Sequence, residues 1–133
     1  MTSVLLDTHI LVWWQLGRGR LSQAQTRTLL EVEAGTVSAA ISGITLWEAA
    51  VLVERGRVEI AGSPDVWLDE IERHPRLTVL PITAAVAAES TRLGRDFPKD
   101  PADRIIVATA RCHGLRLVTA DEHIRRWGKV PVI

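Results

Sequence analysis

The most constraining feature of this 133-residue sequence is its alternation of short apolar runs with longer helical stretches. Four runs read as strands because they are brief, apolar and bounded by turn or cap residues. They are 3–6, 36–40, 77–82 and 115–119, and 130–133 suggests a further edge strand. Strands that alternate with helices are joined by right-handed crossovers, which place helices on both faces of the sheet. The sequence therefore predicts an α/β fold of three layers with a mostly parallel central sheet.

Start and stop signals delimit the helices between these runs. Ser63-Pro64 and Asp100-Pro101 each place a cap residue before a proline at the first helical position. Ser22, Ser42 or Gly43, and Thr83 open other helices, and Asp121 could cap a short last one. The expected helices cover about 9–16, 23–34, 43–55, 64–73, 84–93 and 101–113, with glycines after most of them.

Composition narrows the class of protein. The formal net charge is zero and 47% of residues are hydrophobic, which excludes a disordered chain and a generally basic nucleic-acid binder but leaves room for local basic patches. Cys112 is the only cysteine, so an intrachain disulfide and a thiolate zinc cluster are excluded. There is no leader pattern, no apolar run of about 18 residues and no dividing linker. We expect one domain over 1–133 in a soluble, cytoplasmic protein without a membrane partner.

An acid in an apolar helix is the first sign of a functional site. Glu48 lies within the stretch ITLWEAAVLV and shares a helix face with Ile44, Val51 and Leu52, which must turn toward the sheet. A buried, unpaired carboxylate costs several kcal/mol or takes up a proton. Something nearby should therefore neutralise Glu48.

Three further acids are expected at the same edge of the sheet. Asp7 follows the first strand, and Asp121 lies two residues past 115–119. Asp103 lies in the first turn of a helix whose inner face is apolar. Each has a simpler explanation, as a turn residue, a helix cap or an acid favoured by the helix dipole. Together they predict an all-oxygen site for Mg²⁺ or Mn²⁺ outside the carboxyl ends of the strands, of the kind that hydrolyses phosphodiesters by activating water.

Four segments resemble the PIN-domain ribonucleases, specifically the VapC-type toxins of bacterial toxin–antitoxin pairs. They are VLLDTHILVWW (4–14), SGITLWEAAVLVERGRVEI (42–60), DPADRIIVATARCHGL (100–115) and LVTADEHI (117–124), in the family's order. The third is similar to the DPFDR motif of one VapC subgroup, with Ala102 in place of phenylalanine. The resemblance implies a PIN-like fold over the whole chain.

The resemblance also implies an activity, a site and partners. Asp7, Glu48, Asp103 and Asp121 would be the catalytic, metal-binding acids, supported by the hydroxyls of Thr45 and Thr119, whereas Asp100 is expected to cap a helix. The implied protein is an Mg²⁺- or Mn²⁺-dependent endoribonuclease toxin that acts on RNA. It would be a homodimer, neutralised by a VapB-type antitoxin with which it forms a higher assembly.

Other residues remain open in their interpretation. His9, Arg18, Arg20 and Arg104 are candidates for contacts with RNA. The simpler alternatives are that the arginines only form part of a solvated surface and that His9 has a structural role. Trp47 is expected in the core, and the adjacent Trp13 and Trp14 cannot both face it squarely. The alternative function is a PIN fold kept only for docking protein or RNA. A small-molecule phosphatase would be expected to have a D-x-D motif after the first strand, whereas this chain has D-T-H there.

Overall fold

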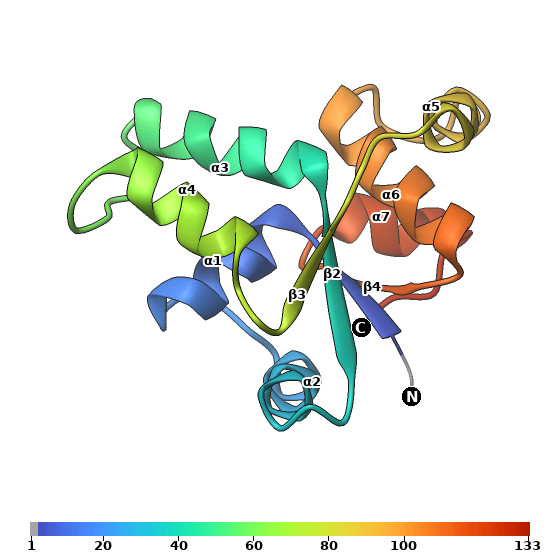
Figure 1. Cartoon of the computed structure of the whole chain (residues 1–133). Coiled ribbons are helices and arrows are strands. Elements are labelled where there is room, and N and C mark those ends of the chain that lie inside the picture. The colour runs from blue at the N-terminus through green and yellow to red at the C-terminus, as the bar shows by residue number, and fades with distance from the viewer. Residues whose placement is uncertain (1–2) are drawn as a thin grey trace.

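The computed structural model describes residues 3–133 and contains a four-stranded sheet in the order β3-β2-β1-β4, with every neighbouring pair parallel (Figure 1). The strands are β1 (Ser3–Leu6), β2 (Ser38–Ser42), β3 (Leu77–Leu80) and β4 (Arg116–Val118). β1 and β2 are the central strands. The predicted parallel α/β fold is confirmed.

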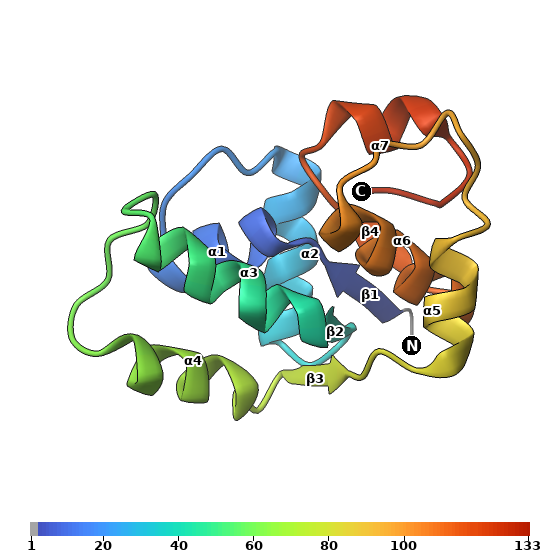
Figure 2. The same cartoon turned by 90° about the horizontal axis from the view of Figure 1, so that it is seen from above.

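Helices cover both faces of this sheet, as expected. α1 (Thr8–Leu16), α2 (Gln23–Glu33), α3 (Gly43–Glu54) and α4 (Pro64–Glu72) contribute to one core cluster, and the other lies beneath α6 (Pro101–His113) and α7 (Glu122–Trp127). α5 (Ala84–Ser90) packs against α6. Seen from above, α1, α3 and α4 lie on the left and α5, α6 and α7 on the right (Figure 2). In the part of the chain from Ser3 onward, no helix is long and apolar enough to cross a membrane.

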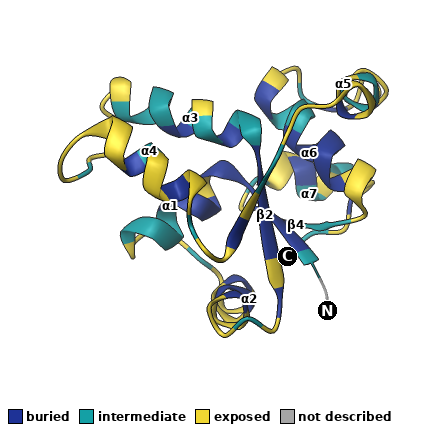
Figure 3. Cartoon of the chain, in the orientation of Figure 1, coloured by how far each residue is buried: buried dark blue, intermediate teal, exposed yellow. Residues whose placement is uncertain are grey.

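The first strand shows why both faces must be covered. Val4 and Leu6 belong to the first core cluster and Leu5 to the second, as the two-residue period of a strand requires. None of the three has measurable exposed surface. A continuous apolar run therefore becomes a central strand, and the central strands and inner helix faces form the buried interior in Figure 3.

Several strand boundaries differ from the predictions: β2 is displaced by two residues, to Ser38–Ser42, β3 is shorter at its end, and β4 is shorter by one residue at each end. β2 begins at Ser38 rather than at residue 36, because the N–H groups of Thr36 and Val37 both donate to the carbonyl of Glu31 and so still belong to the end of α2. β3 ends at Leu80 rather than at residue 82 because Pro81 has no N–H for the ladder.

The last turn of α5 was also predicted wrongly, and the C-terminal segment differs in part from its prediction. α5 ends at Ser90 instead of near Gly94, since the hydroxyls of Ser90 and Thr91 donate to the carbonyls of Ala87 and Ala88 and compete with the helix for acceptors. Residues 130–133 form no strand. They nevertheless lie along β4: Val132 and Leu117 form a parallel bridge, the N–H groups of Leu117 and Thr119 donate to the carbonyls of Pro131 and Ile133, and the Ile133 N–H donates to that of Leu117.

Candidate active site

Asp7 lies where β1 passes into α1, and its carboxylate is held on both oxygens. It is the N-cap of α1, with Oδ1 accepting from the Thr8 N–H at 2.8 Å. Oδ2 accepts from the Thr119 hydroxyl at 2.6 Å. The Asp7 N–H donates to the carbonyl of Val118, which joins the end of β1 to the end of β4. Asp7 is 8% exposed, so strand pairing and two hydrogen bonds fix a buried acid at the carboxyl edge of the sheet.

Asp121 is linked to Asp7 through Thr119. The Thr119 hydroxyl accepts from the Asp121 N–H at 3.0 Å while it donates to Asp7. Oδ1 of Asp121 accepts from the N–H groups of His123 and Ile124 and caps α7, as one reading of the sequence proposed. Capping occupies only one carboxylate oxygen. The other is still available to a ligand of the site.

Glu48 reaches the site through a short chain of hydroxyls. Its Oε1 accepts from the Thr8 hydroxyl at 2.6 Å, and the Thr8 and Thr45 hydroxyl oxygens lie 3.1 Å apart. A threonine has one hydroxyl proton, so Thr8, which donates to Glu48, must accept from Thr45. Thr45 therefore contacts the glutamate indirectly. Thr8, which the sequence analysis did not select, is the direct partner.

Asp103 completes the group from the first turn of α6. Asp100 caps that helix as expected, with Oδ1 accepting from the N–H groups of Ala102 and Asp103. Burial, followed by repulsion from Asp7, Asp100, Asp121 and Glu48, raises the pKa of Asp103 to about 7. Four acids from separate segments therefore act on Asp103 at once.

The pKa values of Asp7 and Glu48 are shifted in the same direction. Burial raises the pKa of Asp7, against the hydrogen bonds from Thr119 and Thr8 that lower it. Burial also raises the pKa of Glu48, against its bond from Thr8 and with repulsion from Asp7 adding to the rise. The three ion pairs within residues 3–133 involve the other acids Asp69, Glu89 and Asp96. The site thus concentrates negative charge without a paired side-chain cation among the described residues.

The donor set fits a hard divalent cation. No three His, Cys, Asp or Glu side chains in the described part of the chain form a ready-made cage for a metal ion. Mg²⁺ does not need one, since it keeps several waters and is bound by one or two carboxylates together with substrate phosphate. Asp7 supplies a fixed carboxylate and Asp121 a free oxygen. A cation between them would relieve the repulsion that raises the pKa of Asp103.

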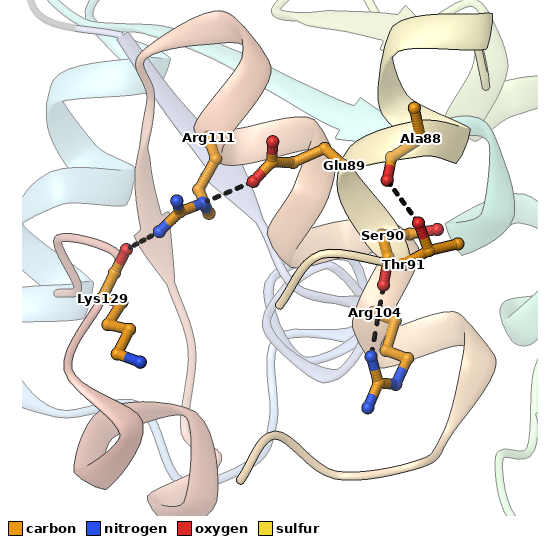
Figure 4. A network of polar contacts seen from close by, with 7 residues as sticks. All are labelled: Ala88, Glu89, Ser90, Thr91, Arg104, Arg111 and Lys129. Carbon is orange, nitrogen blue, oxygen red and sulfur yellow. Dashed lines mark hydrogen bonds and ion pairs between the residues drawn. The ribbon is translucent and has the colours of Figure 1, made fainter. Parts of the chain in front are cut away.

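The structure gives Arg104 and Arg18 contacts that the sequence did not suggest. The Arg104 guanidinium donates to the carbonyls of Ser90, Gly94 and Phe97, and the first of these bonds is drawn in Figure 4. It thereby holds the segment between α5 and α6, which is a structural use of a side chain expected to meet RNA phosphate. Arg18 donates to the carbonyl of Glu59.

His9 and Arg20 are both exposed, and His9 lines a hollow together with the site acid Glu48. His9 is exposed at the start of α1, packs at a tilt against Trp13 with ring centroids 6.0 Å apart, and lowers the pKa of Asp7 and Glu48 by its charge. Arg20 lines an open hollow of about 1140 Å³ together with Trp13 and Arg125.

Gln25 is a second site-supporting residue that sequence reasoning missed. It is buried on α2, and its Nε2 donates to the carbonyls of Thr119 at 3.0 Å and Ile133 at 3.2 Å. Arg125 donates to the same Thr119 carbonyl at 2.7 Å. The only signal in the sequence is the Ser22-x-x-Gln25 capping box, which is present but gives no hint of Thr119.

Comparisons with known proteins agree with this arrangement. The PIN domain family model matches residues 4–130. Ribonuclease VapC22 of Mycobacterium tuberculosis is 40% identical over 125 residues, covering 94% of this chain and 92% of the relative. A toxin–antitoxin complex from Klebsiella pneumoniae contains a chain that is 25% identical with a TM-score of 0.66, covering 98% of this chain and 95% of that one. A chain of VapBC2 from Rickettsia felis, bound to a DNA fragment from their promoter, shares the fold with a TM-score of 0.71 at 17% identity, covering 99% and 98%. The chain belongs to the PIN domain family and, within it, to the VapC group.

Proposed function

We propose that this protein is an endoribonuclease toxin of a toxin–antitoxin pair, that it requires Mg²⁺ or Mn²⁺, and that it acts in the cytoplasm. One observation carries the proposal. Asp7, Glu48, Asp103 and Asp121 come from four distant segments, yet they lie close enough for their charges to raise the pKa of Asp103. The similarity to a ribonuclease over most of both chains supports RNA as the substrate.

The four acids have unequal parts in the proposed mechanism. Asp7 and Asp121 are positioned by Thr119 and by the starts of α1 and α7, and would be the first ligands of the cation. Glu48 is oriented by Thr8, and Asp103 projects from the first turn of α6. A bound divalent cation supplies the charge that stabilises the phosphodiester transition state and lowers the pKa of the attacking water. The chain itself holds the acids and limits their motion.

The proposed protein partners are suggested by the structures of similar proteins. The Klebsiella pneumoniae relative is a toxin–antitoxin complex, and the Rickettsia felis structure is a VapBC assembly. We infer that this chain is a homodimer and is neutralised by a VapB-type antitoxin that forms a higher assembly with it.

A PIN fold kept only for docking is the competing function. A protein that only docks partners, without catalysis, would have no use for four mutually repelling acids, three of them with raised pKa values. A calorimetric titration with Mg²⁺ and with Mn²⁺ separates the two. We expect binding heat for the wild type that Asp103→Asn abolishes, and RNA cleavage that stops when a chelator is added. A docking protein would show neither the acid-dependent heat nor the cleavage.

Replacing Thr8 by valine tests the hydroxyl that orients Glu48. Thr8→Val keeps the shape but removes the bond to Glu48 and the acceptor for Thr45. Loss of such a partner to a metal ligand costs about 10- to 100-fold. We expect the Mg²⁺ concentration for half-maximal RNA cleavage to rise by that factor, and to rise less in Thr45→Val because Thr45 acts through Thr8.

Thr28→Val provides the matched control for this pair. The Thr28 hydroxyl donates to the Ala24 carbonyl within α2, so the change removes a hydrogen bond outside the site. Its Mg²⁺ dependence should equal that of the wild type. An unchanged Mg²⁺ dependence in Thr8→Val would show that Glu48 needs no hydroxyl partner.

A further inference from the structure

Trp47 is exposed next to a site acid, contrary to the sequence prediction that it lies in the core. It is 59% exposed and directly precedes Glu48. The inner face of α3 buries Thr45 and Ala49, each two residues away, and two residues turn a helix by about 200°. Trp47 therefore points away from the sheet while Glu48 points toward the acids.

The surface around Trp47 is hollowed, and the hollow reaches the acid site. Trp47 and Glu48 line it together, with a volume of about 620 Å³. Its other lining residues include the apolar side chains of Ile44, Val51 and Leu52, the cationic or ionisable side chains of His9, Arg55 and Arg57, and Asp100. The hollow therefore brings apolar side chains, an exposed tryptophan and two arginines together beside the site acid Glu48. Pockets for small ligands span about 300–1,000 Å³, so a hollow of this size accommodates a nucleotide.

We propose that Trp47 is a stacking platform for the base of an RNA nucleotide adjacent to the phosphate held at the acids. The inference rests on the proposed function and names the part of the substrate that this hollow takes. Every nucleobase has an aromatic face, and stacking on a tryptophan removes apolar surface from water at both partners. Arg55 and Arg57 line the same hollow, and in this proposal they bind the phosphates that flank the stacked base.

The charges of the hollow favour RNA over an apolar protein segment as its occupant. Two arginines and His9 line the hollow beside Trp47 and the aliphatic side chains, and the arginines are complementary to phosphate. Glu48 and Asp100 oppose an anion, but only until the acid site is neutralised. Stacking on Trp47 is therefore expected to strengthen when a divalent cation is present.

Steady-state cleavage of an RNA whose cut site has been mapped on the wild type tests the platform. We expect Trp47→Ala to lower kcat/KM by about 10- to 100-fold, mainly through KM, and Trp47→Phe to retain most of the activity. Leu30→Ala is the matched control, because Leu30 is also 59% exposed but lies on α2 and outside this hollow. It should leave kcat/KM unchanged.

A series of the same RNA with a single abasic position, moved stepwise along the strand, identifies the stacked base. One abasic position next to the cut should reduce wild-type kcat/KM as much as Trp47→Ala does, and should cause no further loss in that variant. Equal losses from Trp47→Ala at every abasic position would overturn the stacking role.

Sedimentation distinguishes a protein contact at the same surface. We expect Trp47→Ala and the wild type to have the same oligomeric state. If Trp47→Ala dissociates an oligomer while kcat/KM is unchanged, Trp47 belongs to a protein interface and the proposal is wrong. A wild-type protein that cleaves no RNA contradicts the proposed function itself, whereas wild-type cleavage with no effect of Trp47→Ala contradicts this inference alone.

Discussion

Asp7→Asn is expected to lower RNA cleavage by about 10³-fold or more and to abolish growth arrest, while the protein remains folded. The carboxylate of Asp7 is the most rigidly held of the four acids, since each of its oxygens accepts a hydrogen bond. An amide of the same shape removes one oxygen ligand and the negative charge. A site that depends on charge to hold a divalent cation should therefore lose nearly all activity.

The fold should tolerate this change for identifiable reasons. Asparagine caps helices as well as aspartate does, so the bond from the Thr8 N–H to the side chain persists. In the wild type the Thr119 hydroxyl donates to Asp7. In the variant the same hydroxyl can accept a hydrogen bond from the asparagine amide. Burial of the Asp7 charge, which raises the pKa of that group, is removed as well. We expect the variant to be at least as stable as the wild type.

Cleavage of an end-labelled RNA and thermal melting monitored by circular dichroism measure the two effects separately. Asp65→Asn is the control, because Asp65 is an exposed acid in the first turn of α4 and contacts no site acid in the structure. It should cleave RNA at the wild-type rate. Undiminished cleavage by Asp7→Asn would refute the assignment of the active site.

Asp103→Asn is expected to raise the stability of the metal-free protein at neutral pH. Burial and repulsion raise the pKa of Asp103 from 3.8 to about 7, so its ionised form opposes folding. The full shift corresponds to about 4 kcal/mol. Asp103 is only partly buried, and solvent screening reduces the contribution to about 1–2 kcal/mol. Loss of a favourable charge near the N-terminus of α6 offsets about 0.3–1 kcal/mol of that gain.

The sign of the pH dependence follows from proton binding. Between about pH 4 and 7 the unfolded chain has lost the Asp103 proton while the folded chain keeps it. Stability of the metal-free wild type therefore falls as pH rises through this range and levels off above about 7. The raised pKa values of Asp7 and Glu48 act in the same direction. The advantage of Asp103→Asn should be absent near pH 4 and largest above pH 7.

Melting temperatures measured with a chelator from pH 4 to 8 test this expectation. An advantage of about 3 °C is expected for Asp103→Asn at pH 7.5. Asp65→Asn changes an exposed first-turn acid and should show only a small, pH-independent loss. Added Mg²⁺ should stabilise the wild type more than Asp103→Asn, since only the intact site binds it well. A difference between the variants that does not change with pH would contradict the electrostatic origin of the effect.

Local chemistry explains why so much of the fold could be predicted. Strand positions such as Val4 to Leu6 are apolar on both sides, and caps such as Ser63 and Asp100 satisfy the N–H groups that begin α4 and α6. The boundary errors arose at helix and strand ends, where hydrogen bonds between residues three to six positions apart, or a proline without an N–H, compete with the apolar pattern. The carbonyl of Glu31 keeps Thr36 and Val37 out of β2, and a hydroxyl pair shortens α5.

The acids of the candidate site were also accessible to sequence reasoning. Parallel strands share a carboxyl edge, so acids that follow β1 and β4 are placed near each other by topology alone. Helical periodicity placed Glu48 and Asp103 on inward faces. The residues that support these acids were not accessible in this way. Thr8 and Gln25 are polar residues of common types whose partners lie 40 and 94 positions away.

The sequence by itself determined the parallel sheet, the helix starts and the candidate acids, because each depends on a residue's own period, cap or position at a strand end. Only the tertiary structure decided that Thr8 orients Glu48, that Arg104 holds the segment before α6, and that Trp47 faces solvent. Hydrogen-bond partners and exposure depend on which distant segments fill the space around a side chain. No local pattern specifies that space before the sheet and its helices have packed.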